Sequence, residues 1–147
     1  MTDTLGDFTA DLARWQAQVG ERSDLLVQGF SQRLANEAIS GGKFSPGTPI
    51  DTGFARANWD GGIGAIPANP PAGSPGAAVA RVDEAVLRAQ AGDLVYLSNT
   101  APYIRRLEYG WSKQAPAGFI RLALAAGQQI ADEVGALIAG ASGGPAG

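Results

Sequence analysis

Residues 8–34, "FTADLARWQAQVGERSDLLVQGFSQRL", set the architecture that we expect for this chain. Their large apolar residues recur mostly at steps of three or four, which is the period of an amphipathic helix: Phe8, Leu12, Trp15, Val19, Leu26, Phe30 and Leu34. Asp7 is a suitable N-cap, and Gly41-Gly42 is a clear stop. A helix of about 30 residues spans about 45 Å. Because it has only one apolar stripe, it needs something long to lie against.

The composition indicates one domain with a thin core. The chain has 147 residues, of which 45% are hydrophobic, but many of these are alanines that fill little volume, and 21 Gly and 9 Pro predict extensive irregular structure. We therefore expect the core to be supplemented by association with neighbours. The chain has no Cys and no His, which removes disulfides, thiol and imidazole catalysis and most transition-metal sites. We predict no cofactor and no metal.

The charge pattern argues against nucleic acid, secretion and membrane insertion. The net charge is −3, so no global basic field attracts phosphates. The N-terminus carries acids in place of the basic region of a signal peptide, and no apolar run approaches the roughly 20 residues of a membrane span. These features predict a soluble protein.

Downstream of the first helix, the sequence predicts turns and short strands. Asp51-Thr52-Gly53 has the chemistry of an Asx-type turn, and Phe54 to Trp59 is interpreted as the start of a strand. The Gly/Pro-rich segment 61–78 is interpreted as an extended loop. A short strand then precedes a helix over 84–90, with Asp83 as its cap, and residues 94–97 form a strand closed by Ser98-Asn99.

The last third of the sequence predicts a short helix and a long one. Pro102 starts a helix over 103–109 that Gly110 ends, and apolar residues at helical spacing continue from Phe119 to Leu137. The fold class is therefore α+β: a long N-terminal helix, a small mainly antiparallel sheet, short helices, and a long C-terminal helix packed on the sheet. We expect a single domain over 1–140 and a flexible tail over 141–147.

Residues 101–118, "APYIRRLEYGWSKQAPAG", hold the densest group of aromatic and charged side chains. A carboxylate hydrolase built on Glu108 needs a second acid nearby, and only Asp51 or Asp93 could supply it through the fold. The simpler interpretation is that Glu108 pairs with an arginine across a turn or a subunit boundary, so we predict no enzyme. The Gly-rich stretches fit no nucleotide-binding motif.

Two kinds of surface remain open for this segment. Four basic residues and three aromatic ones would suit a platform on which nucleic-acid bases stack: Arg105, Arg106, Lys113 and Arg121, with Tyr103, Tyr109 and Trp111. Tyr, Trp and Arg also dominate the energetically important centres of protein interfaces. The acidic composition favours the protein interface.

Two separate segments resemble a known family. "TPIDTGFARANW" (48–59) and "LSNTAPYIRRLEYGWSKQAPAGFIRLAL" (97–124) are similar to the two hallmark segments of the phage neck or tail-completion proteins, of the minor tail protein Z type. Phe54 departs from the pattern, since a polar or basic residue often follows that glycine. The long leading helix and the closing helix also agree with the family's order of elements.

The resemblance implies a structural virion protein of the head–tail junction of a tailed phage, prophage or gene-transfer particle, assembled in the host cytoplasm. It implies a homo-oligomeric ring, hexameric in preference to dodecameric, that contacts other neck, connector and tail-tube proteins. Double-stranded DNA would pass through its lumen without sequence-specific binding. Tail terminator and head-closure stopper remain alternatives, and a nucleic-acid-binding module is a further one.

The expected interface residues all lie in the two hallmark segments. Asp51, Thr52 and Gly53 are expected to shape a turn, and Asn99 to end a strand. The complete predicted set is Asp51, Thr52, Gly53, Arg56, Trp59, Asn99, Tyr103, Arg106, Glu108, Tyr109, Gly110, Gln114, Pro116 and Gly118.

Overall fold

The computed structural model describes residues 5–68 and 73–142, in a mixed α+β fold that is mostly helical. The helices are α1 (Leu5–Ile39), α2 (Phe54–Ala57), α3 (Pro75–Val86), α4 (Ile104–Glu108), α5 (Ile120–Ala125) and α6 (Gly127–Ser142). The strands are β1 (Trp59–Ile63) and β2 (Val95–Asn99). They pair antiparallel, with Trp59 opposite Asn99 and Ile63 opposite Val95.

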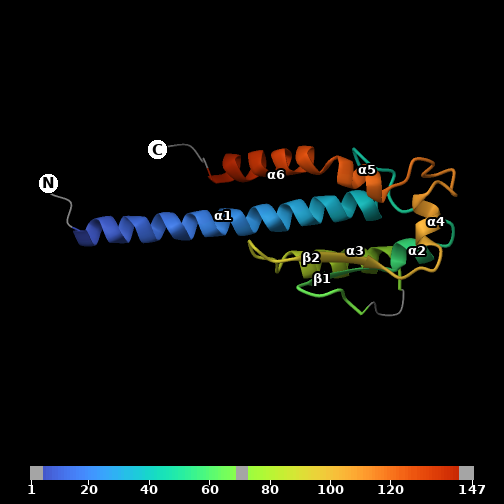
Figure 1. Cartoon of the computed structure of the whole chain (residues 1–147), viewed down its shortest axis with the longest axis horizontal. Coiled ribbons are helices and arrows are strands. Elements are labelled where there is room, and N and C mark those ends of the chain that lie inside the picture. The colour runs from blue at the N-terminus through green and yellow to red at the C-terminus, as the bar shows by residue number, and fades with distance from the viewer. Residues whose placement is uncertain (1–4, 69–72, 143–147) are drawn as a thin grey trace.

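The long helix α1 lies at the centre of the fold, and the other main elements pack on it. Over its C-terminal half, α5 and α6 lie on one side of it, and α3 with the two strands lies on the other (Figure 1). The expected C-terminal helix is therefore present, and it packs mainly on α1, while Ile120 of α5 packs against the cluster that includes Trp59 of β1. It is also divided: α5 ends at Ala125 and α6 begins at Gly127. The N-terminal part of α1 projects beyond all the other elements (Figure 1).

Two small clusters make up the core, and alanines outnumber larger side chains among the buried apolar residues, as the composition predicts. The first cluster joins α1 to α3, β1 and the segment before α5: Ala35, Ile39, Trp59, Ala78, Val82, Val86, Ala115 and Phe119. The second joins α6 to α1 through Ile130 and Val134, with Phe30 and Leu34 packed against them.

Three local predictions are wrong. Phe54 does not start a strand, because residues 54–57 form the one-turn helix α2, in which the Ala57 N–H donates to the Gly53 carbonyl at 2.9 Å. The strand begins only at Trp59. There is no strand at 78–82 and no helix cap at Asp83. Instead, α3 begins at Pro75, where the Ser74 hydroxyl accepts a hydrogen bond from the Ala77 N–H.

The Gly/Pro-rich segment 61–78 is shorter as a loop than predicted, because residues 61–63 belong to β1 and residues 75–78 belong to α3. Gly61 fits a strand here since α3 packs closely on it: an added Cβ would lie 3.2 Å from the Cβ of Ala85. Residues 69–72 of this segment lie outside the described residues. Of the predicted tail 141–147, the first two residues belong to α6 and residues 143–147 lie outside the description.

Candidate functional site

The two segments singled out in the sequence meet at the end of the body opposite the N-terminus, where residues 43–58 and 100–119 form turns and short helices (Figure 1). We call this region the loop end. It contains a cleft of about 220 Å³. The turn 49–55 forms one wall of the cleft, and Tyr103, Leu107, Trp111, Ser112 and Gln114 form the other.

Gln114 locks the two segments together. Its side-chain N–H donates to the Ile50 carbonyl at 2.7 Å, and its side-chain oxygen accepts from the Ile50 N–H at 2.9 Å. The amide thus pairs with the backbone of residue 50 as a neighbouring strand would. This contact holds the wall of the cleft in place.

Thr48 is the centre of a second network. Its hydroxyl donates to the Ala38 carbonyl in α1 and accepts from the indole N–H of Trp59, both at 2.8 Å. Its carbonyl accepts two hydrogen bonds from the Arg56 guanidinium, at 2.8 and 3.1 Å. Burial lowers the pKa of Arg56 from its ordinary value. Trp59 and Arg56 therefore brace the turn against α1.

Glu108 is buried, with 8% of its surface exposed, and acts as a cap for α5. Its carboxylate accepts hydrogen bonds from the N–H groups of residues 119, 120 and 121 at 2.8–2.9 Å, and from Arg121 Nε at 3.0 Å. Arg121 Nη2 also donates to the Glu108 carbonyl at 2.8 Å. These N–H groups belong to the first turn of α5, where a carboxylate is favoured. The expected arginine pairing is present, but Glu108 does not present its charge to a partner.

The pKa of Glu108 is the result of opposing effects. Burial by itself raises it, while hydrogen bonds from the backbone of Phe119, Arg121 and Ile120 and from the Arg121 side chain lower it. The net pKa lies below the ordinary value of 4.5, because several donors satisfy the ionised form. Glu108 is therefore held as a carboxylate, and it is not among the residues that line the cleft.

A second buried carboxylate, Glu37, escaped the sequence analysis. It lies near the end of α1 and accepts 3.0 Å hydrogen bonds from the N–H groups of residues 43, 44 and 45. The Ser45 hydroxyl then donates to the Phe119 carbonyl at 2.8 Å, which connects this turn to the one that Glu108 caps. No local spacing signals the role of Glu37, because its partners lie across a turn of irregular backbone.

Glycines make the turns possible. Gly53, Gly110 and Gly118 all have positive φ, between 87° and 91°. At Gly118 an added Cβ would lie 2.7 Å from the Glu108 carboxylate, and at Gly110 it would lie 2.5 Å from the Pro116 carbonyl oxygen. In the predicted Asx-type turn, the Thr52 hydroxyl accepts a hydrogen bond from the Phe54 N–H at 3.3 Å. Asp51 is exposed on the wall of the cleft.

Asn99 ends β2, as predicted, and ties it to α2. Its side-chain N–H donates to the Ala55 carbonyl at 2.7 Å, and its side-chain oxygen accepts from the Ala101 N–H at 2.9 Å. Asn58 makes a further contact near this strand end: its side-chain oxygen accepts a hydrogen bond from the Thr100 hydroxyl at 3.2 Å. The strand end is thus fixed relative to the cleft.

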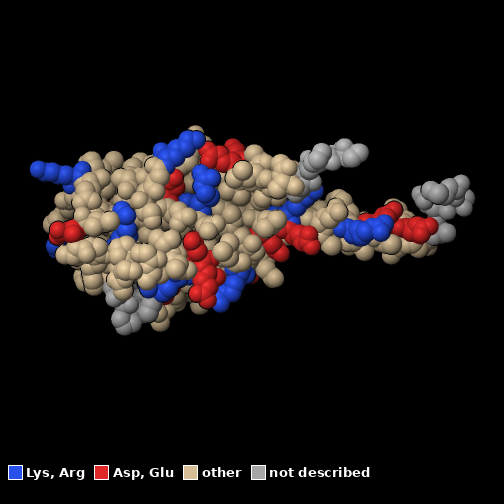
Figure 2. Space-filling view, turned by 180° about the vertical axis from the view of Figure 1, so that it is seen from behind, with Lys and Arg blue, Asp and Glu red and all other residues tan. Residues whose placement is uncertain are grey.

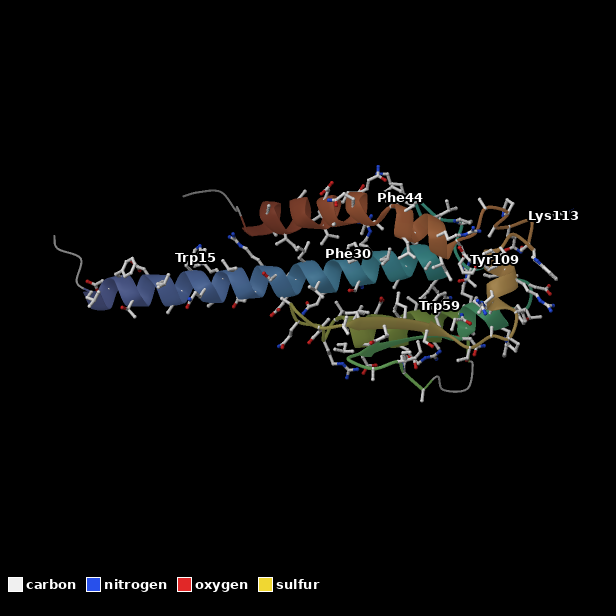
Figure 3. All side chains as sticks on the ribbon, in the orientation of Figure 1. Trp15, Phe30, Phe44, Trp59, Tyr109 and Lys113 are labelled. Atoms are coloured by element: carbon white, nitrogen blue, oxygen red, sulfur yellow. The ribbon has the colours of Figure 1, made fainter. Side chains whose placement is uncertain are left out.

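Four aromatic side chains of the loop end are exposed. We call Phe54, Tyr103, Tyr109 and Trp111 the aromatic surface; Trp111 is 71% exposed. The rings of Phe54 and Tyr103 lie 6.2 Å apart, and guanidinium groups lie over the other two, Arg106 at 4.8 Å from Trp111 and Arg121 at 5.2 Å from Tyr109. Figure 3 shows Tyr109 and Lys113 at this end of the molecule.

The predicted site residues therefore divide into two groups. Tyr103, Arg106 and Tyr109 belong to the exposed group, to which the structure adds Phe54 and Trp111. The remaining predicted residues lie in the turns that carry the surface or in the elements that adjoin them: Asp51, Thr52, Gly53, Arg56, Trp59, Asn99, Glu108, Gly110, Gln114, Pro116 and Gly118. The turn at Thr52-Gly53 and the strand end at Asn99 were predicted; the buried position of Glu108 was not.

No family model matches this chain, and comparisons with curated proteins and with solved structures find no match either. Within residues 5–68 and 73–142, no helix has the length and apolarity needed to cross a membrane. The same ranges contain no group of three or more acidic side chains placed to hold a metal ion.

Proposed function

We propose that this chain is a structural protein of the head–tail junction of a long-tailed phage or phage-like particle. It acts there as one subunit of a homo-oligomeric ring around the DNA channel, which completes the tail or joins it to the head. One observation carries the proposal: the two segments that resemble neck proteins are bonded to each other through Gln114 and Ile50, and together they present the aromatic surface.

The aromatic surface has the composition of a protein-binding surface. Exposed Tyr and Trp side chains supply large contact areas with few rotatable bonds, and arginines stacked on them add charge and hydrogen-bond donors. The turns beneath are held by buried hydrogen bonds, so binding would need to order little additional backbone. A repeated contact from this surface to a different patch on the next copy, or on a neighbouring neck protein, would close a ring.

The basic residues do not favour a nucleic-acid platform. Arg106 and Arg121 lie over the rings of Trp111 and Tyr109, so one face of each ring is already covered and only the other is open to a base. On the face seen in Figure 2, acidic and basic side chains are interspersed. This pattern suits passage of DNA through a lumen without sequence-specific binding. If the chain were a nucleic-acid module instead, it would bind duplex DNA with an affinity that falls steeply with salt.

Virion preparations from cells that encode the chain test the proposal. We expect the chain to purify with complete particles and a specific antibody to label the head–tail junction. In a strain lacking the gene, unjoined heads and tails should accumulate, and the Trp111→Ala variant should fail to restore joining. Leu94→Ala is the matched control: Leu94 is 66% exposed, at the opposite end of β2, and the variant should restore joining. Complete particles that lack the chain would overturn the proposal.

The neck layer can be assigned in the same strain. If the chain is a terminator, we expect its loss to give tails of abnormal length; if it is a stopper, heads that leak DNA; and if it is a completion protein, full heads beside tails of normal length. We propose completion first, with terminator and stopper as the alternatives.

A further inference from the structure

The projecting N-terminal part of α1 and the turns that follow it, through residue 26, carry an apolar stripe that the described part of the chain leaves exposed. We define this stripe as Leu5, Phe8, Leu12, Trp15, Val19 and Leu26. Trp15 is 60% exposed, and Figure 3 shows it on the part of α1 that extends beyond the body. Burying such a stripe is the main source of stability for most helices. Gly6 and Gly20 weaken this stretch further.

The spacing of the stripe indicates what would cover it. Residues 5, 8, 12, 15, 19, 22 and 26 follow steps of three and four in strict alternation, which is the a/d pattern of a coiled coil. All but Arg22 are apolar. A pattern of this kind packs against another helix in preference to a sheet or a loop. From residue 5 to residue 26 the seam is about 33 Å long.

The seam continues an interface that already exists within the chain. The next position after Leu26 is Gly29, where an added Cβ would lie 2.7 Å from Cγ1 of Val134 in α6. A groove of about 300 Å³ marks the transition, with Val19, Arg22 and Leu26 on one side and Ile138 of α6 on the other. Since α6 runs antiparallel to α1 (Figure 1), a second antiparallel helix on the seam would continue the line of α6.

The charge of Arg22 and the area of the stripe indicate which partner helix would fit. In a parallel pair of α1 helices in register, Arg22 would oppose its own copy within the seam, which is unfavourable. In an antiparallel pair, Leu12 packs on Trp15 of the second copy, Phe8 on Val19, and Leu5 on the aliphatic stem of Arg22. Covering the stripe on both copies would bury on the order of 1,000 Å², the lower bound for a specific interface.

We infer that the projecting part of α1 pairs antiparallel with the same part of a second copy of this chain. The contact is isologous and closes at two copies, so it differs from the repeated contact that a ring requires. It lies at the opposite end of the molecule from the aromatic surface and does not rest on the proposed function.

Light scattering of the purified full chain during size-exclusion chromatography tests the pairing. The wild type should elute with twice the 15.0 kDa mass of the chain. Trp15→Glu and Leu12→Glu should each elute as monomers, with a dissociation constant raised at least about 30-fold, as for a central aromatic contact. The control Leu137→Glu alters an equally apolar side chain on α6 that is 67% exposed, and it should remain dimeric.

Cross-linking tests the orientation. The chain has no cysteine, so a single introduced thiol is unique in each copy. With a short thiol cross-linker, a mixture of Leu5→Cys and Arg22→Cys chains should yield a dimer that neither variant yields alone. Efficient cross-linking of Leu5→Cys alone would show parallel pairing and overturn the inference. Two further results would overturn the inference: a wild-type chain that is monomeric at every concentration, or a Trp15→Glu variant that dimerises as tightly as the wild type.

Discussion

The most prominent side chains at the two ends of this molecule lie in opposite environments. At the loop end, the polar residues that first suggest a reactive site are bonded to the chain itself: Glu108 to α5, Gln114 to residue 50, and Arg56 to Thr48. Along the projecting part of α1, the apolar side chains that should form a core remain in solvent. A dense cluster of polar residues can thus mainly stabilise the fold, while an amphipathic stripe leaves apolar surface exposed to solvent.

The loop end should lose the most stability when Trp59 is removed. Trp59 is buried and donates to Thr48, so Trp59→Ala creates a cavity and leaves the Thr48 hydroxyl with one partner fewer. We expect a loss of about 4 kcal/mol in the free energy of unfolding. For a domain of this size, that corresponds to a fall of about 8–16 °C in Tm by calorimetry. A fall of only a degree or two would show that the turn is not braced through Trp59.

Glu108→Gln should cost about 2–3 kcal/mol at neutral pH, since the amide offers one acceptor oxygen where the carboxylate satisfies four donors. The loss should depend on pH. The pKa of Glu108 is lower in the folded chain than its ordinary value of 4.5, so its stabilising effect is complete above that value and disappears as pH falls through the folded pKa. Denaturation of both proteins by urea between pH 7 and pH 3 measures this effect.

Glu133→Gln is the control for this prediction. Hydrogen bonds from Lys43 and Arg33 lower the pKa of Glu133 as well, but the group lies at the surface. Water screens such pairs, so this variant should be destabilised much less than Glu108→Gln. If the two variants lost equal stability, or if the deficit of Glu108→Gln did not shrink on acidification, burial of the carboxylate would not be the source of its effect.

A pair of glycine substitutions compares the covered part of α1 with the projecting part. Gly29→Ala should destabilise the fold by about 1 kcal/mol, because crowding against Val134 outweighs the gain in helix propensity. At Gly20 an added Cβ meets nothing within 4 Å, so Gly20→Ala should raise helicity in circular dichroism without loss of stability. The same sign of change at both sites would remove the distinction between the two parts of the helix.

Trp111→Ala should have the smallest effect on stability. Trp111 is exposed, and its contact with Arg106 lies at the surface, so the free energy of unfolding should change by no more than about 0.5 kcal/mol. Its effect should appear instead in particle assembly. If the variant unfolded as readily as Trp59→Ala, Trp111 would belong to the supporting framework and not to the aromatic surface.

The sequence predicts well those elements that depend on local pattern. The first helix, β2, the short helix after Pro102 and the last helical region follow from periodicity and from Gly or Pro at their ends. It predicts poorly what depends on distant partners. The strand through Gly61 exists because α3 packs on it, and α3 begins earlier than expected because Ser74 and Pro75 form its N-terminus.

Prediction of the candidate site from the sequence is limited in the same way. Clustering located the loop end, but it could not reveal that Glu108 faces inward, since the N–H groups that it binds lie 11 to 13 residues further along the chain. Glu37 was missed for the same reason. A charged residue near a turn can serve either the turn or a partner, and only the three-dimensional path of the backbone distinguishes the two.

The most direct test of the central claim is a cryo-EM reconstruction of the head–tail junction in particles from cells that encode this chain. We expect a ring of this protein around the DNA channel, with Tyr109 and Trp111 buried against a neighbouring subunit and Glu108 still bonded to α5. A junction in which the chain is absent, or a ring whose Trp111 side chains all face solvent, would contradict it.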